Sequence, residues 1–488
     1  MYSSVTSCAL VGVDPRAVQI ETVVSRGSGG FVIVGLPDTA IRESRERVRS
    51  AIREAGHHFP GGNVVVNLSP ADLPKVGATY DLPIALSVLA AASDNRLNFD
   101  RFVPVGELSL HGRVRPVRAA LGATVVAEHQ GKTCLLSSDS SIAASDDAEI
   151  AGVTSLAHAV AVAQGRREPD HVRQPADVVT ESFDLADVRD QPVARRALEV
   201  AAAGRHHLLF VGPPGVGKTM LARCLPSILP PLDASDQREV ALVWAAAGAD
   251  RPPSATPPFR APHHSSSMAA LVGGGAGLPT PGEASRAHRG VLFLDELGEF
   301  PTRVLDALRQ PIEDGFVSVA RQAASFRFPT AVQLIAASNP CPCGNLGDRI
   351  EPCTCIESRK ARYVARLSGP FLDRFDMRVS LGRLRPAALA GPKGEPSSAV
   401  RARVVAARQR QSDRGKLNSR LSASDLDDLE MSSEAVAALS AAVEESNLSA
   451  RGWDRVRRVA RTIVDLEAGA IVEGRHVKEA LLLRGCMA

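Results

Sequence analysis

The stretch that decides the fold is residues 210–219, which read Phe-Val-Gly-Pro-Pro-Gly-Val-Gly-Lys-Thr. The apolar segment from Leu208 to Val211 predicts a strand, and residues 220–225 predict a helix. Strand, glycine-rich loop and helix in this order form the context of a phosphate-binding P-loop. The alternative at this point is an ordinary glycine-rich turn.

This loop offers several ligands to a nucleotide. Its glycines let the backbone curl so that N–H groups face a polyphosphate, and the helix adds its positive end. Lys218 would reach the β- and γ-phosphates, and the Thr219 hydroxyl would bind Mg²⁺. The expected nucleotide-binding residues are Gly212, Pro213, Pro214, Gly215, Val216, Gly217, Lys218 and Thr219.

A second motif, residues 291–296, reads Val-Leu-Phe-Leu-Asp-Glu. Four consecutive apolar residues are typical of a parallel strand that is covered on both faces. Asp295 at the end of this strand can hold Mg²⁺, and Glu296 can polarise the attacking water. Two acids that end a strand downstream of a P-loop indicate nucleotide hydrolysis rather than a solvated surface.

Composition narrows the remaining classes. With 488 residues, 44% of them hydrophobic, roughly two to four domains are expected. The net charge of +3 is too mild to indicate nucleic acid by itself, and 4% aromatics argue against an extended base-stacking platform. No secretory leader and no apolar run of about 18 residues occur, so we expect a cytoplasmic protein that does not bind membranes.

The first 165 residues predict a mixed α/β domain. Strands are expected at 18–24, 31–35 and 64–68, helices at 39–55, 81–92 and 119–129, and a hairpin turn at 111–112. The helix at 39–55, with Asp38 as its N-cap, is strongly charged. We interpret it as a solvated helix with internal ion pairs rather than a nucleic-acid contact.

Two segments of this domain are informative together. Residues 73–79 read Leu-Pro-Lys-Val-Gly-Ala-Thr, and residues 116–123 read Pro-Val-Arg-Ala-Ala-Leu-Gly-Ala. The domain resembles the proteolytic domain of Lon-type proteases, with Thr79 at the nucleophilic serine and Ala123 at the catalytic lysine. A hydroxyl nucleophile needs a base, alanine cannot serve, and Lys132 lies too far along the chain. The resemblance therefore implies a Lon-like fold without peptidase activity.

The segment between the two phosphate motifs is unusual. Residues 259–267 read Phe-Arg-Ala-Pro-His-His-Ser-Ser-Ser, and a glycine-rich run at 271–277 indicates a mobile loop. His263 and His264 lack further ligands, so we do not interpret them as a metal site. The arrangement resembles the AAA+ ATPases of the magnesium-chelatase group. Matches along nearly the whole chain indicate the ComM/YifB family within that group.

This resemblance implies an α/β fold with three parts. They are a P-loop AAA+ core with a parallel sheet between helices, an N-terminal Lon-protease-like α+β domain and a C-terminal all-α lid. Linkers are predicted where the sequence becomes rich in polar residues, Pro or Gly. The expected divisions are the inactive Lon-like domain at 1–165, a linker at 166–182, the ATPase core at 183–385, a linker at 386–400 and the lid at 401–488.

The same resemblance gives roles to three further residues. Asn339 follows an apolar strand and resembles the sensor that positions the attacking water. Arg374, within Phe-Leu-Asp-Arg-Phe-Asp at 371–376, resembles an arginine finger that reaches the γ-phosphate of a neighbouring subunit. Arg451 matches the sensor arginine of the lid and would touch the bound nucleotide. A finger acting between subunits requires an oligomer, and the family expectation is a hexameric ring.

Two basic features are candidates for contact with DNA. Residues 316–319 and 325–328 predict a hairpin with Arg321 near its tip, which in relatives points into the ring pore. One arginine is also an ordinary surface charge. Three arginines share roughly one face of a later helix and either line a nucleic-acid surface or pack against acidic groups of a neighbour: Arg455, Arg458 and Arg461.

Four of the eight cysteines cluster as C-x-C, nine residues, C-x-C. Four thiolates this close, with two glycines between the pairs, can wrap a tetrahedral Zn²⁺ and leave no open position, so the role would be structural. Reduced free thiols and a redox switch are alternatives, because the spacing is tighter than in common zinc sites. The candidate ligands lie in a possible insert at 341–355 and are Cys341, Cys343, Cys353 and Cys355.

Together these features predict an ATP- and Mg²⁺-dependent, ring-forming DNA motor. By resemblance it would be of helicase or branch-migration type and act in homologous recombination of incoming DNA during transformation. Binding to single-stranded or branched DNA would be mostly to phosphates, hence salt-sensitive and sequence-independent. The alternatives are a protein-remodelling ATPase without DNA contact, an ATP-dependent protease, which Ala123 argues against, and a scaffold with a dead nucleotide site.

Overall fold

A computed structural model of the chain divides into two compact units. The first comprises Met1–Val178 with Gln237–Ser254 and Ala320–Arg327, and the second comprises Val179–Asp236, Ala255–Val319 and Phe328–Ala488. The residues that the structure describes are 1–27, 29–35, 39–73, 75, 77–93, 97–142, 149–173, 183–249, 251, 253–275, 279–320, 325–348, 350–367, 369–383, 391–446 and 448–485. Two stretches of the expected ATPase core, 237–254 and 320–327, thus group with the first unit.

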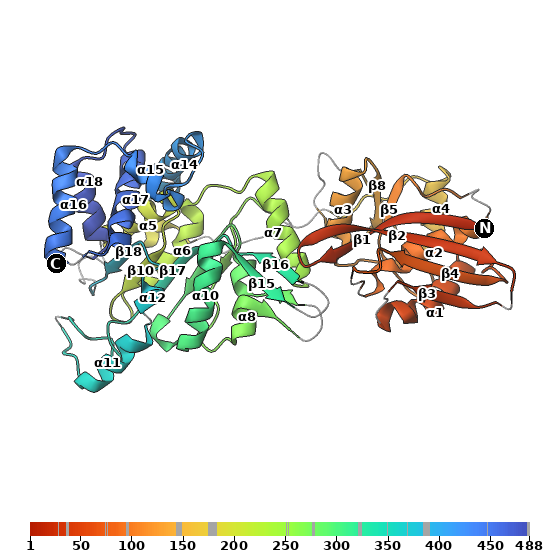
Figure 1. Cartoon of the computed structure of the whole chain (residues 1–488), viewed down its shortest axis with the longest axis horizontal. Helices are drawn as coiled ribbons and strands as arrows, with labels where there is room; N and C mark the ends of the chain where they lie inside the picture. The colour runs from red at the N-terminus through yellow and green to blue at the C-terminus, as the bar shows by residue number, and fades with distance from the viewer. Residues whose placement is uncertain are drawn as a thin grey trace. The chain divides into compact units, whose positions relative to one another are not determined.

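The first unit is built on two sheets (Figure 1). The larger sheet has the order β1-β2-β4-β3 and is antiparallel except for the β3–β4 pair. The smaller parallel sheet has the order β5-β8-β9, beside the short hairpin β6–β7. The strands are β1 (Tyr2–Val11), β2 (Asp14–Ser25), β3 (Phe31–Val34), β4 (Asn63–Ser69), β5 (Phe102–Pro104), β6 (Glu107–Leu108), β7 (Val114–Arg115), β8 (Thr133–Ser137) and β9 (Ile150–Val153).

Helices of the first unit confirm most of the predicted pattern. The apolar helix α2 (Asp81–Ala92) is buried along almost its whole length and packs on β1 and β2. In the charged helix α1 (Thr39–Glu54), Arg47 bonds the buried Asp81 of α2 at 2.6 Å, so this arginine is structural. The expected N-cap, Asp38, lies outside the described residues. The other helices are α3 (Ala120–His129) and α4 (Leu156–Ala163).

The second unit contains a five-stranded parallel sheet with the order β11-β14-β17-β10-β18. Successive residues of its central strands point to opposite faces, so Leu208 and Phe210 join one core cluster and Leu209 joins the other. Burial on both faces explains why these strands read as continuous apolar runs. The strands are β10 (Leu208–Val211), β11 (Phe259–Arg260), β14 (Val291–Leu294), β17 (Gln333–Ser338) and β18 (Met377–Ser380).

Further helices and short strands lie between these strands along the chain. Helices α5, α6 and α14 pack together, and β15 pairs with β16 as the expected hairpin, whose tip at 321–324 lies outside the described residues. The elements are α5 (Pro192–Gly204), α6 (Lys218–Ile228), α7 (Ala234–Ala246), α8 (Met268–Val272), β12 (Gly273–Gly274), β13 (Thr280–Pro281), α9 (Glu283–Arg286), α10 (Thr302–Asp314), β15 (Phe316–Ala320), β16 (Ser325–Pro329), α11 (Glu357–Arg366) and α12 (Gly369–Leu372).

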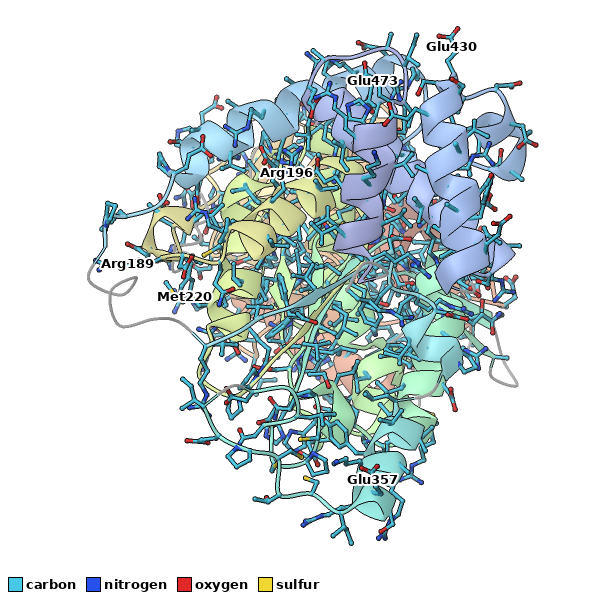
Figure 2. All side chains as sticks on the ribbon, turned by 90° about the vertical axis from the view of Figure 1, so that its left-hand side faces the viewer. Arg189, Arg196, Met220, Glu357, Glu430 and Glu473 are labelled. Carbon is cyan, nitrogen blue, oxygen red and sulfur yellow. The ribbon has the colours of Figure 1, made fainter. Side chains whose placement is uncertain are left out.

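The C-terminal part is helical, as expected for a lid. Figure 2 shows Glu430 and Glu473 of this part at the opposite end of the second unit from Glu357, the first residue of α11. Among the described residues, every helix is too short or too polar to cross a lipid bilayer. The helices are α14 (Ser397–Asp413), α15 (Ala423–Asp427), α16 (Ser433–Ser446), α17 (Ala450–Leu466) and α18 (Gly474–Leu483).

A buried carboxylate ties the lid helices together. Asp465 of α17 is fully buried and accepts hydrogen bonds from Arg414 at 2.5 and 2.9 Å, from Arg461 at 2.9 Å and from Asn418 at 2.7 Å. A buried charge of this kind is tolerated only because its partners neutralise it and occupy its lone pairs. The network therefore fixes α17 against the segment that follows α14.

We expect Asp465→Ala to lower the unfolding free energy of the second unit by about 3 kcal/mol, because the substitution leaves Arg414 and Arg461 without their shared anion. Denaturant unfolding followed by circular dichroism measures this change. Asp413→Ala is the matched control, since Asp413 is exposed and accepts a bond from Gln409 of its own helix. Equal unfolding midpoints for the two variants would contradict the role given to Asp465.

Candidate active site

The loop between β10 and α6 has the backbone of a phosphate cradle. Gly215 and Gly217 adopt positive φ angles of 79° and 88°, a region that residues with a Cβ rarely enter. Gly212 is needed for a different reason, because a Cβ there would lie 2.6 Å from the carbonyl oxygen of Leu381. The three glycines identified from the sequence are therefore each required by the geometry.

Lys218 begins α6 with its ammonium group inside the curl of the loop. Its Nζ donates to the carbonyl oxygens of Gly212 and Pro213 at 2.5 and 2.8 Å and to Oδ1 of Asn339 at 3.0 Å. Burial lowers the pKa of Lys218, and the carboxylates of Asp295 and Glu296 oppose that shift. The ammonium can exchange these carbonyl partners for phosphate oxygens without leaving the loop.

The metal-binding pair lies beside the lysine. Thr219 donates from Oγ1 to Oδ2 of Asp295 at 2.8 Å, so the two expected Mg²⁺ ligands already touch. A cavity of about 380 Å³ opens between the loop and the ends of β14 and β17. Its lining is Pro214, Gly215, Val216, Gly217, Lys218, Thr219, Met220, Asp295, Glu296, Ala337, Ser338 and Asn339.

Glu296, the expected base, has a partner that the sequence did not reveal. The residue adopts a left-handed conformation with φ of 50°, and its Oε2 lies 3.2 Å from Nδ1 of His264. The His264 ring packs against His263 with centroids 4.0 Å apart and the planes tilted by 35°, and it forms a T-shaped contact with Phe300. The two histidines that we did not interpret as metal ligands thus include one that contacts the expected base.

Asn339 occupies the end of β17, as the resemblance implied. Its side chain accepts from Lys218, and its backbone carbonyl accepts from the Tyr363 hydroxyl at 3.2 Å. Tyr363 lies on α11 and is buried. The sensor residue is therefore held from both sides, by the P-loop lysine and by α11.

Arg374 and Arg451 are brought to each other rather than to the P-loop. Both line a pocket of about 240 Å³ with Glu313 and Arg458, and neither lines the nucleotide cavity among the described residues. Arg374 is buried and pairs with Glu313 at 2.7 Å. Within one chain the hydrolytic residues therefore form one cluster, and the two arginines form another.

The basic face of α17 is engaged within the chain. Arg455 lies 3.5 Å from Asp376, Arg458 donates to the carbonyl of Leu421 at 2.9 Å, and Arg461 pairs with Asp465. These contacts are with acidic and carbonyl groups of the same chain. The choice between a nucleic-acid surface and packing against a neighbour stays a prediction.

In the Lon-like region, the residue aligned with the catalytic lysine of Lon-type proteases is part of the hydrophobic core. Ala123 is fully buried within α3 in an apolar cluster, and Lys132 donates to Thr6 at 3.1 Å. Lys75 is buried and bonds the carbonyl oxygens of Gly35 and Pro70. Pro74 and Val76 of the Lon-like stretch lie outside the described residues.

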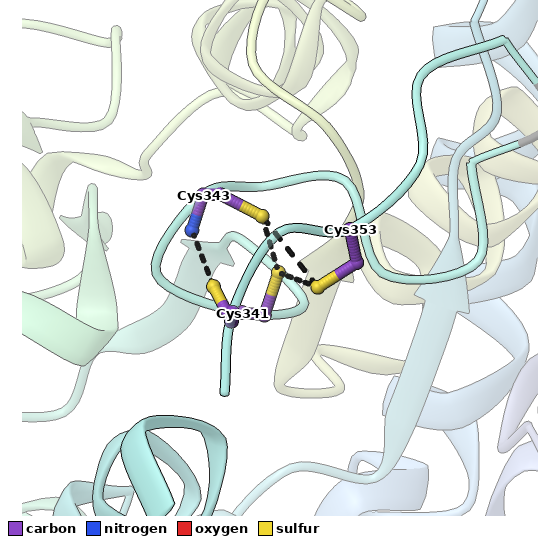
Figure 3. A group of neighbouring side chains, drawn as sticks. Cys341, Cys343 and Cys353 are labelled. Carbon is purple, nitrogen blue, oxygen red and sulfur yellow. Dashed lines mark hydrogen bonds between the residues drawn. The ribbon is translucent and has the colours of Figure 1, made fainter. Parts of the chain in front are cut away.

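The four clustered cysteines do come together. They are free thiols, and their sulfur atoms lie within 4.8 Å of one another (Figure 3). Backbone N–H groups of Asn345 and Thr354 lower the pKa of the Cys343 thiol to about 5. Such a group can hold a metal ion through its sulfurs.

Three family models match the chain. "Subunit ChlI of Mg-chelatase" matches residues 20–140, "Magnesium chelatase, subunit ChlI" matches 184–389, and its C-terminal model matches 394–484. YifB of Escherichia coli is 40% identical over 99% of this chain and 97% of its own length. Competence protein ComM of Haemophilus influenzae is 39% identical over 98% and 96%.

The chain belongs to the ComM/YifB family. This family carries magnesium-chelatase-like AAA+ modules, so membership implies an ATPase that uses ATP and Mg²⁺. An uncharacterized protein of Mycobacterium tuberculosis is 44% identical over 94% of both chains. Lon protease 2 of Bacillus subtilis is 33% identical over 136 residues, which confirms the Lon-like resemblance of one part of the ComM/YifB chain.

We expect His264→Ala to lower kcat about tenfold and leave KM for ATP nearly unchanged, because the histidine orients the base rather than the nucleotide. Steady-state ATPase assays measure both constants. His263→Ala is the matched control, since His263 is exposed and bonds Ser265 rather than Glu296. A rise in KM with unchanged kcat would place His264 in nucleotide binding instead.

Proposed function

We propose that this chain is the subunit of a ring-forming ATPase that moves on DNA. The work would be helicase or branch migration during homologous recombination of incoming DNA in transformation. ATP and Mg²⁺ would be bound by the P-loop, Thr219 and Asp295, and a structural zinc ion would be held by the clustered cysteines. Glu296 would activate water that Asn339 positions.

The location of Arg374 is the observation that supports assembly into a ring. Its guanidinium lies in a pocket separate from the P-loop cavity of its own chain, with Arg451 beside it. An arginine finger stabilises the charge that spreads over the γ-phosphoryl oxygens in the transition state. We therefore propose that Arg374 and Arg451 both serve the nucleotide of an adjacent subunit.

The similarity to a competence protein supports DNA as the substrate on which the ring moves. One relative of nearly equal length is a competence protein, and competence is the uptake of DNA. The matching magnesium-chelatase models favour a second candidate, a protein-remodelling ATPase without DNA contact. The two candidates share the hydrolytic site and differ only in whether the ring acts on DNA or on a protein.

The ATPase rate with and without single-stranded and forked DNA separates these candidates. We expect stimulation at low salt that fades as salt rises, because phosphate contacts release counterions. Glu296→Gln, which keeps the cavity and removes the base, controls for contaminating ATPase. A basal rate untouched by DNA, under conditions where the ring assembles, would favour protein remodelling.

Mixing two variants tests whether Arg374 of one subunit acts on the nucleotide bound by its neighbour. We expect Arg374→Ala to lower the ATPase rate by about 10³ while ATP still binds. Adding Lys218→Ala subunits, which lack the P-loop lysine but keep Arg374, should restore part of the activity. Glu313→Gln is the matched control, because it removes the partner of Arg374 and keeps the guanidinium. Failure of mixed rings to recover any activity would contradict this action of Arg374 on a neighbouring subunit.

A further inference from the structure

The segment between β17 and α11 begins and ends at the hydrolytic site. It leaves β17 at Asn339, passes through all four clustered cysteines, and enters α11, whose Tyr363 hydroxyl returns to the Asn339 carbonyl. Figure 3 shows the sulfurs of Cys341, Cys343 and Cys353 turned toward one another. The cysteines are therefore part of a closed loop anchored on the sensor residue.

The sulfur positions fit a four-coordinate metal ion. The distance between sulfurs is 3.3 Å for Cys341 and Cys343, 3.7 Å for Cys341 and Cys353, and 3.6 Å for Cys343 and Cys353. Zinc–thiolate bonds of about 2.3 Å in a tetrahedron place sulfurs about 3.8 Å apart. These three sulfur–sulfur distances lie close to the spacing in such a tetrahedron. They are also well above the ~2.05 Å of a disulfide bond.

Groups around the sulfurs hold this arrangement in place. The backbone N–H of Cys343 donates to Sγ of Cys355 at 3.3 Å. Arg383, just after β18, pairs with Asp348 at 2.6 Å and Glu351 at 2.8 Å, and both acids lie between the two cysteine pairs. Such outer contacts orient ligands before the metal binds.

The loop also touches the phosphate cradle. Gly344 is buried with φ of 86°, and a Cβ there would lie 2.6 Å from the ring of Pro214. Pro214 lines the nucleotide cavity. The turn within the cysteine loop thus packs directly on the P-loop, while its start carries Asn339.

We propose that Cys341, Cys343, Cys353 and Cys355 bind one Zn²⁺ as four thiolates, and that this ion holds Asn339 and Pro214 in the positions that hydrolysis requires. All four sulfurs bind as thiolates, so any proton that a thiol still carries is released to solvent, and no coordination position is left for water or substrate. The ion is structural, and no redox step is involved. Zinc binding is independent of the DNA motor, whereas its effect on hydrolysis rests on the proposed ATPase.

Metal content tests the site itself. Full-length protein purified without chelator should hold one zinc per chain by mass spectrometry of the metal, and Cys353→Ser should lose it. Cys8→Ser, which removes a thiol of the first unit, should keep it. Cobalt exchanged into the protein should give the intense visible absorption of a tetrahedral thiolate site. Absence of metal and of the cobalt spectrum, with four thiols freely titratable, would overturn the inference.

The link to hydrolysis has its own test. Chelation of zinc from the wild-type protein should lower kcat by about tenfold to 100-fold, because a small displacement of Asn339 misplaces the water, and added zinc should restore it. Tyr363→Phe should keep the metal and lower kcat, since it removes the hydroxyl that bonds the Asn339 carbonyl and the Ser338 hydroxyl at the end of β17. Unchanged hydrolysis after zinc loss would overturn the link, whereas zinc bound to a chain without any ATPase activity would contradict the proposed function and leave the metal site intact.

Discussion

Two hydrogen bonds from the start of α6 to the ends of two neighbouring strands hold the proposed hydrolytic residues together. Lys218 reaches Asn339 at the end of β17, and Thr219 reaches Asp295 at the end of β14. Both bonds exist because β10, β17 and β14 are adjacent parallel strands, whose carboxyl ends meet at one edge of the sheet. Register in this sheet is set by burial on both faces, so the core packing also sets the distance between base, metal ligands and phosphate cradle.

In the proposed ring, one chain would supply only part of a catalytic centre. Arg374 is buried beside Glu313, and a guanidinium desolvated in this way needs an anionic partner. A phosphate from an adjacent subunit would replace one set of oxygen acceptors by another in the same fork geometry. Exchange between Glu313 and phosphate therefore gives a physical route by which assembly and nucleotide state depend on each other.

The sequence predicted what depends on neighbours along the chain. The P-loop, the acidic strand end and the helices at 81–92 and 120–129 follow from local pattern, and the structure has them within a few residues. It missed the long strand β1, the bond from His264 to Glu296, and the pocket that Arg451 and Arg374 line together. The bond and the pocket depend on which distant segments the fold brings together, and residue spacing carries no signal of that. Strand β1 pairs with β2, the next strand along the chain.

The two segments that depart from a simple P-loop enzyme contact the two residues proposed to act on water. His264 comes from the segment between the two phosphate motifs and touches Glu296, and Tyr363 follows the cysteine loop and touches Asn339. Neither of these side chains lines the nucleotide cavity among the described residues. Interactions that act on the base and the water, not on the nucleotide, change kcat rather than binding. A change in the conformation of either segment would therefore alter the rate of the chemical step, while the nucleotide stays bound.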